Sequence, residues 1–211
     1  TEITEFAATY PEIYAEWAPN EKVALEVAIG ASVGGARSFC AMKHVGLNVA
    51  ADPLFTVGYT GVNAGLVIAV ADDPSMHSSQ NEQDSRHYAK ASKIPMLEPA
   101  DSQECKEFIG LAYELSESFD TAVLYRLVTR VAHSQSIVEL DDRKDIPLRD
   151  YQKDISKYVM MPGNAMRRHP IVEKRIEELV EMAETCPVNR VEYHDRSIGI
   201  ITSGMCYNYV K

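Results

Sequence analysis

The 211-residue sequence lacks any apolar run of the roughly 18–20 residues that a membrane-spanning helix needs. No basic stretch followed by an apolar one stands at its start, so we expect a soluble cytoplasmic protein that is not exported. Basic residues are also scarce, because 21 Lys and Arg face 31 Asp and Glu and the formal charge is -10. Phosphate recognition needs a basic face, so this balance argues against a nucleic-acid-binding protein.

Cysteine is scarce too, and the four cysteines form no C-x-x-C pair. The wide spacing of Cys40, Cys105, Cys186 and Cys206 therefore indicates neither a zinc site nor an iron–sulfur cluster. We expect free thiols, no metal bound by this chain, and a buried core position for Cys40. The sequence also lacks the G-x-G-x-x-G and Walker patterns that hold nucleotide phosphates.

Apolar runs alternate with longer helical patterns, which is typical of a parallel α/β domain. The run at 66–71 is continuously apolar, as expected of a strand covered on both faces. We expect strands near 14–17, 38–42, 66–71, 94–97 and 122–129. We expect helices near 21–36, 44–56, 81–91 and 102–118, the third opened by a capping-box spacing at 79–82.

The composition changes after about residue 133, and this divides the chain. We expect a main α/β domain over 1–140 and a linker region over 141–194 that opens with a charge run and carries an amphipathic helix at 170–185. Residues 195–211 look like the first strand and turn of a following α/β domain. The basic triplet at 167–169 is expected to be solvated.

Glu21 stands at the start of a helix rich in small residues, directly after a Pro-Asn turn in which Asn20 is the expected N-cap. On physical grounds alone, Glu21 is a carboxylate stabilised by the positive end of that helix. Glu26 lies five positions later and therefore faces elsewhere, where a solvated or interface role is expected.

Two further stretches carry candidate site residues. Lys43, His44 and Gly46 follow an expected buried strand and open a helix, which is where ligands bind in open parallel sheets, although a solvated loop is the alternative. The glycine lets a backbone approach closely. The polar stretch 72–87 follows the most apolar strand, and His77 is its best candidate, although capping and solvation account for part of this polarity.

The strings MKHVGLNVAADPL at 42–54 and VADDPSMHSSQNEQD at 70–84 resemble the alpha subunit of indolepyruvate:ferredoxin oxidoreductases, as does the turn, Glu and small-residue helix before them. The likeness covers 14–133 and continues more loosely to the C-terminus. It implies the pyrimidine-binding fold of thiamine diphosphate enzymes over 1–140, with Glu21 as the carboxylate that activates the aminopyrimidine. It also implies that Asn20 and Gly46 lie beside the cofactor and that Lys43, His44 and His77 contact the substrate.

The resemblance further implies a cytoplasmic enzyme of anaerobic metabolism that oxidatively decarboxylates aryl 2-oxo acids, passes electrons through [4Fe-4S] clusters to ferredoxin and hands the acyl group to coenzyme A. Mg²⁺ and the clusters are implied for the whole enzyme, but this chain has neither the G-D-G…N pattern nor cluster ligands. We therefore expect a fragment that is inactive alone and supplies one wall of the site. Its expected partners are the diphosphate-binding and ferredoxin-like domains of the alpha subunit, a beta subunit, and a second copy.

Two alternatives stay open. One is a thiamine-dependent 2-oxo acid decarboxylase subunit of the sulfopyruvate or phosphonopyruvate kind, and the other is a non-catalytic α/β assembly module.

The substrate class is inferred from a departure within the family. Related pyruvate enzymes place an arginine near the end of the strand that corresponds to 66–71, where this chain has Asp72 and Asp73 and no Lys or Arg between Lys43 and Arg86. We expect the acidic pair to repel a carboxylate, so that Lys43 or His44 holds the substrate acid group and leaves room for an aryl side chain.

Overall fold

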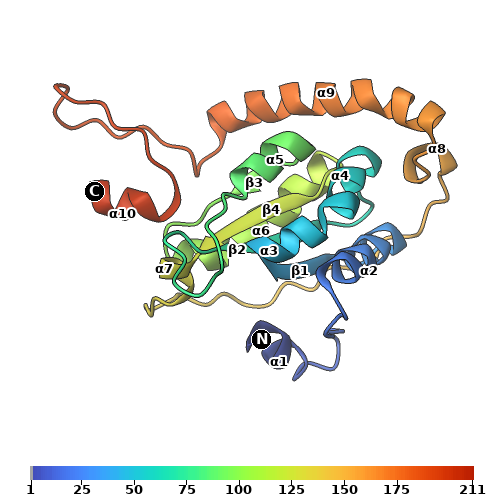
Figure 1. Cartoon of the computed structure of the whole chain (residues 1–211), viewed down its shortest axis with the longest axis horizontal. Coiled ribbons are helices and arrows are strands. Elements are labelled where there is room, and N and C mark those ends of the chain that lie inside the picture. Colours follow the sequence, from blue (N-terminus) through green and yellow to red (C-terminus); the bar gives the residue numbers. More distant parts are fainter. Residues whose placement is uncertain (1) are drawn as a thin grey trace.

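The computed structural model describes residues 2–211. Its centre is a four-stranded parallel sheet in the order β1-β2-β4-β3, formed by β1 (Ser38–Lys43), β2 (Leu66–Asp72), β4 (Val123–Val128) and β3 (Met96–Leu97). The longer helices are α2 (Glu21–Gly34), α4 (Ala51–Thr60), α6 (Ser102–Ser118) and α9 (Pro162–Thr185). Short ones are α1 (Glu2–Ala7), α3 (His44–Val49), α5 (Arg86–Ser92), α7 (Thr129–Ala132), α8 (Ile155–Tyr158), a 3-10 turn (Gly204–Cys206) and α10 (Tyr207–Val210). The expected parallel α/β class is confirmed (Figure 1).

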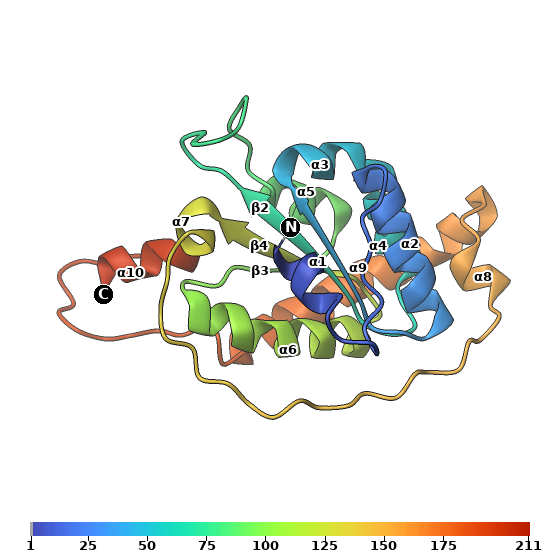
Figure 2. The same cartoon turned by 90° about the horizontal axis from the view of Figure 1, so that it is seen from below.

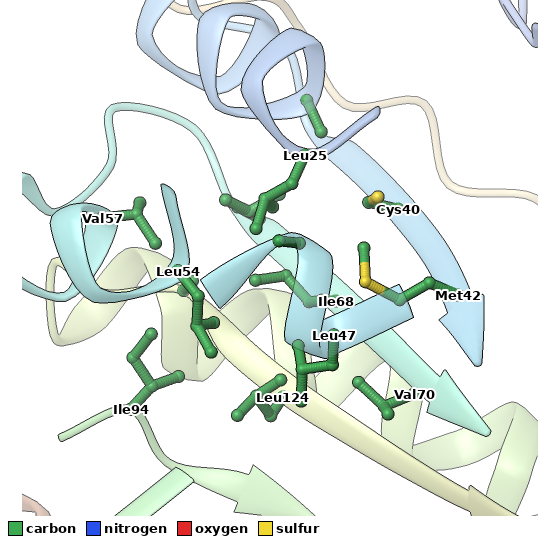
Figure 3. Packing of buried hydrophobic residues seen from close by; sticks show 14 of the residues in the cluster. Leu25, Cys40, Met42, Leu47, Leu54, Val57, Ile68, Val70, Ile94 and Leu124 are labelled. Atoms are coloured by element: carbon green, nitrogen blue, oxygen red, sulfur yellow. The ribbon is translucent and has the colours of Figure 1, made fainter. Parts of the chain in front are cut away.

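Helices cover both faces of the sheet, and each face has its own apolar cluster. On one face, Leu25, Leu47 and Leu54 from α2, α3 and α4 meet Ile68 and Leu124 of the sheet (Figure 3). On the other face, the helix α6 packs against β2 and β4 through Phe108, Ala112 and Leu115. Each fully buried leucine contributes about 1.5–3 kcal/mol to stability. From Leu66 to Val70 the strand β2 is buried on both faces, as its apolar run predicts, and Ala71 near its end is exposed.

Two expected elements around the first strand are wrong. Residues 14–17 form no strand, and Tyr14 and Trp17 are largely exposed, because no strand within the described residues 2–211 lies beside them to complete the hydrogen bonds. The helix expected over 44–56 is two helices, α3 and α4, that break at Ala50. Pro53 explains the break, because in a continuous helix its ring would clash with the carbonyl of Val49.

The helix expected over 81–91 begins later, at Arg86, and the capping box at 79–82 does not form. The carboxylate of Glu82 accepts a hydrogen bond from the Ser75 amide at 2.7 Å. The Ser79 hydroxyl donates to Asp73 at 2.6 Å. These side chains serve the loop and are therefore not available to cap a helix.

Differences also occur in the C-terminal third. The helix α9 starts at Pro162, eight residues earlier than expected, and continues through Pro170. Residues 198–201 form no strand and are exposed, since no strand of residues 2–211 lies beside them. The described helices include none that is long and apolar enough to cross a membrane.

An extended segment, residues 134–154, connects α7 to α8 along the lower side of the domain in Figure 2. Arg149 anchors it: its amide donates to the Gly35 carbonyl at 2.9 Å, and its guanidinium pairs with Glu117 at 2.9 Å. Gly35 has a φ of 104°, and a Cβ there would lie 1.9 Å from the Arg149 carbonyl oxygen. Gly35 is therefore required both for the end of α2 and for this crossing.

Candidate functional site

The carboxylate of Glu21 is placed by the start of α2. Asn20 caps the helix, because its side-chain oxygen accepts a hydrogen bond from the Val23 amide at 3.0 Å. The Glu21 side chain then lies across Gly46 in the first turn of α3. A Cβ on Gly46 would lie 2.5 Å from Glu21 Cγ and 2.8 Å from Oε1, so that no larger residue fits while Glu21 keeps this position.

The side chain of Glu21 also reaches toward the strand β1. Burial, together with the negative charge of Glu21, raises the pKa of the Cys40 thiol to about 12, so this thiol stays protonated at neutral pH. Cys40 is buried and free, as expected. Glu26 is exposed and lies 3.8 Å from Lys22, which agrees with the solvated role expected for it.

Lys43 and His44 lie at the carboxyl end of β1 but have different surroundings. The Lys43 ammonium donates to the Ser78 carbonyl oxygen at 2.7 Å and forms no ion pair with the side chains described over residues 3–211. His44 is 1% exposed, so the solvated alternative is wrong for it. Its Nδ1 lies 3.4 Å from the carbonyl oxygen of Ala71, and its buried Nε2 has no hydrogen-bond partner in the described chain. An unpaired buried polar atom costs about 1–3 kcal/mol, so Nε2 of His44 is a candidate contact for a bound molecule.

The polar loop after β2 is organised around Asp73. The carboxylate accepts hydrogen bonds from the Ser79 and Thr129 hydroxyls and from the amides of Ser78 and His77, at 2.6–3.1 Å. These bonds, that of Ser79 first, hold the pKa of Asp73 well below its ordinary value. The His77 side chain is exposed and lines a cavity at the end of β4, so the structure does not bring it to Glu21 and Gly46.

Asp72 and Asp73 do not form the free acidic pair that was expected to repel a carboxylate, so that prediction is wrong. Asp72 is 1% exposed, and Arg126 from β4 donates to it at 2.6 Å. The oxygens of Asp73 are already occupied by the four donors of the loop. The sequence alone did not predict the pairing of Arg126 with Asp72, because the two residues lie 54 positions apart. The one available signal was a charged residue inside an otherwise apolar strand, which needs a buried partner.

In the triplet 167–169, Arg167 and His169 are exposed as expected, and Arg168 alone departs from the expected solvated role. Arg168 is buried and donates to the Tyr59 carbonyl at 2.8 Å and to Asp120 at 3.1 Å. Arg175 from the same helix donates to the Gly58 carbonyl at 2.8 Å. These guanidinium groups satisfy the free carbonyls at the end of α4 and hold α9 against it.

The fold and the site together define a class: a parallel α/β domain that presents a helix-borne carboxylate at the carboxyl edge of its sheet, where such folds bind ligands. The described residues contain no group of His, Cys, Asp and Glu arranged to hold a metal ion. The chain belongs to the thiamine diphosphate-binding domain family of pyruvate flavodoxin/ferredoxin oxidoreductases, whose model matches residues 2–195.

The curated relatives support the sequence resemblance. The chain is 48% identical over 202 residues to the indolepyruvate oxidoreductase subunit IorA of Methanothermobacter marburgensis, a match that covers 94% of this chain and 32% of that protein. The subunit IorA of Pyrococcus horikoshii is 43% identical over 224 residues, covering 100% of this chain and 34% of that protein. The chain thus spans about a third of the length of these relatives.

A solved structure shares the fold. The 2-oxoglutarate:ferredoxin oxidoreductase from Magnetococcus marinus, determined with 2-oxoglutarate, coenzyme A and succinyl-CoA bound, superimposes with a TM-score of 0.65 at 15% identity. The match covers 85% of this chain and 40% of that one. The pyrimidine-domain fold expected from the sequence is therefore confirmed.

Proposed function

We propose that this chain forms the aminopyrimidine-facing wall of the thiamine diphosphate site in an oxidoreductase that decarboxylates aryl 2-oxo acids of the indolepyruvate type. The observation that carries the proposal is the Glu21 carboxylate lying across Gly46 at the mouth of α2. Membership of a thiamine diphosphate-binding family and relatives named indolepyruvate oxidoreductase support it.

The residues present fit the cofactor. Gly46 has no Cβ and so leaves room for the Glu21 carboxylate beside α3, and the buried Nε2 of His44 is unpaired within the described chain. When bound, thiamine diphosphate supplies the carbon nucleophile that 2-oxo acid decarboxylation requires. Glu21 would share a proton with N1′ of the aminopyrimidine, and Asn20 and Gly46 would hold that carboxyl group in place. If Nδ1 of His44 donates to Ala71, its Nε2 is left as an acceptor for a bound donor.

Lys43 is the proposed contact of the substrate carboxylate. Its ammonium is held by the Ser78 carbonyl and not by an acid, so its charge remains available. We expect Lys43→Met to raise KM for the 2-oxo acid with a smaller effect on kcat.

The substrate class is tested by steady-state kinetics of the complete enzyme on indolepyruvate, phenylpyruvate and pyruvate. A higher kcat/KM for pyruvate would contradict an aryl 2-oxo acid as the substrate.

The remaining parts of the reaction belong to partners in this proposal. The rest of the alpha subunit and a beta subunit would hold the diphosphate, Mg²⁺ and the [4Fe-4S] clusters, and ferredoxin and coenzyme A would receive the electrons and the acyl group. The outer face of α2 supports close docking, because Val27 is 48% exposed and Gly30 and Gly34 face open space. An apolar helix with one uncovered face is suited to pack against a partner domain or a second copy.

The decisive test is Glu21→Gln in the complete enzyme, with Glu26→Gln as the matched control on the same helix. Glu21→Gln should leave folding intact and lower turnover by several orders of magnitude, because the carboxyl proton shared with the cofactor is lost. Hydrogen–deuterium exchange at cofactor C2 reads this step directly. Exchange that is unchanged in Glu21→Gln, or lost equally in Glu26→Gln, would contradict the role of Glu21 as the carboxylate that activates the aminopyrimidine.

The same preparation separates the alternatives. Retention of thiamine diphosphate by the assembled complex supports an enzyme and excludes the assembly module. Iron–sulfur absorbance supports the oxidoreductase and excludes the 2-oxo acid decarboxylase.

A further inference from the structure

A second cavity lies at the carboxyl end of β3 and β4. It has a volume of about 590 Å³ and is bounded by the loop at 74–77, the ends of these strands and the segment 201–206. Figures 1 and 2 both place α10, which follows that segment, next to α7. In the sheet order β1-β2-β4-β3, this cavity lies beyond β2 from the Glu21 site at β1. It is therefore a separate place for a ligand, with the size of pockets that hold small organic molecules.

The charged groups that line this cavity are mostly cationic. Arg86, Arg126 and Arg130 line it, against a single carboxylate, that of Glu98. Asp72, which pairs with Arg126 at 2.6 Å, does not line the cavity, being 1% exposed. Asp84, which pairs with Arg86 at 2.8 Å, does not line it either.

Arg126 is fixed in place before any ligand arrives. Its side chain is 11% exposed, its Nε donates to Asp72, and its Nη1 donates to Glu98 at 2.8 Å. A guanidinium that is held on two sides keeps one orientation, so little entropy is lost when a ligand binds to it.

Arg130 is the cation left without a counterion. It is exposed, it lines the cavity, and it forms no ion pair with the side chains described over residues 3–211. The hydroxyl-bearing residues Ser75, Thr202 and Ser203 and the ring of His77 line the same space. Hydroxyl and guanidinium donors around one cavity match the acceptor oxygens of a phosphate or carboxylate group.

We propose that this cavity binds the anionic group, a phosphate or a carboxylate, of a small organic ligand, with Arg130 as its main contact and Arg126 as its rigid floor. The site is separate from the proposed thiamine chemistry at Glu21 and does not depend on it.

The test is a titration of the 211-residue chain with sodium phosphate, and separately with sodium acetate, each against sodium chloride at equal ionic strength. Binding is followed by thermal shift and by NMR chemical shifts. We expect saturable binding, and Arg130→Gln should weaken it by roughly tenfold, the effect of losing one charge-assisted hydrogen-bond partner. Tighter binding of phosphate identifies a phosphoryl group as the ligand's anion, and tighter binding of acetate identifies a carboxylate.

Arg167→Gln is the matched control, because it removes the same charge from an exposed residue of α9 that bonds only within its own helix. It should bind like the wild type. Arg130→Lys keeps the charge and should retain most of the affinity, which separates loss of the contact from misfolding. Glu21→Gln should not alter anion binding. A failure of the anion-binding test therefore leaves the proposed thiamine function untouched, and the reverse also holds. Absence of saturable binding of both anions, or equal weakening in Arg130→Gln and Arg167→Gln, would overturn the proposal.

Discussion

Gly46→Ala should disable the proposed cofactor site without unfolding the protein. The added Cβ would lie 2.5 Å from Glu21 Cγ, 2.8 Å from Oε1 and 2.9 Å from Cδ. Ordinary contact begins near 3.4 Å, so the Glu21 side chain must retreat by roughly 1 Å. A misplacement of about 1 Å in a positioned catalytic group costs on the order of 100-fold in rate.

The effect on stability should be small. The clashing atoms, Cγ, Cδ and Oε1, belong to the flexible and partly exposed side chain of Glu21, which relieves the clash by rotating about its Cα–Cβ bond. Replacing glycine by alanine inside a helix gains about 0.5–1 kcal/mol, which offsets the remaining strain. We therefore expect an almost unchanged Tm together with a large loss of C2 hydrogen–deuterium exchange in the complete enzyme.

A matched control and a double variant make this prediction sharp. Gly110→Ala adds the same methyl group to α6 where no atom lies within 4 Å, and it should leave exchange unaltered. If Gly46 acts through Glu21, the loss in Gly46→Ala/Glu21→Gln should equal the loss in Glu21→Gln alone. Wild-type exchange in Gly46→Ala, or fully additive losses in the double variant, would refute the reasoning.

Three further predictions concern the frame around the site. Gly35→Ala should release the segment that Arg149 anchors, because the added Cβ would lie 1.9 Å from the carbonyl oxygen of Arg149. Faster hydrogen exchange at the Arg149 amide would show this release. Gly34→Ala is the control, because Gly34 faces open space. Arg126→Met should destabilise the chain by about 3–5 kcal/mol in urea unfolding, because Asp72 is left charged and buried, and Asp72→Asn in addition should restore part of the loss. The pKa of Asp84 is lowered to about 2, chiefly by hydrogen bonds from Arg86, so its stabilisation is complete above the unfolded pKa of about 3.9 and is lost as pH falls toward 2. Asp84→Asn should flatten that part of the curve of unfolding free energy against pH, and an unchanged slope would contradict the prediction.

The features that can be predicted from the sequence alone depend on neighbours along the chain. The continuous apolar run at 66–71 predicts a strand that is buried on both faces, because its side chains alternate between the two faces and are all apolar. The Pro-Asn turn specifies where α2 begins, because the cap bond from the Val23 amide to Asn20 spans three residues. The place of Glu21 at the mouth of that helix follows directly.

Contacts between residues that are distant in sequence depend on tertiary packing. The contact of Glu21 with Gly46 depends on α2 packing beside α3. The ion pair that neutralises Asp72 depends on β4 lying next to β2, because β4 carries Arg126. Sequence patterns record local periodicity, whereas these contacts depend on which elements pack together. For that reason the sequence named Glu21 as the candidate carboxylate, and only the fold showed what holds it in place.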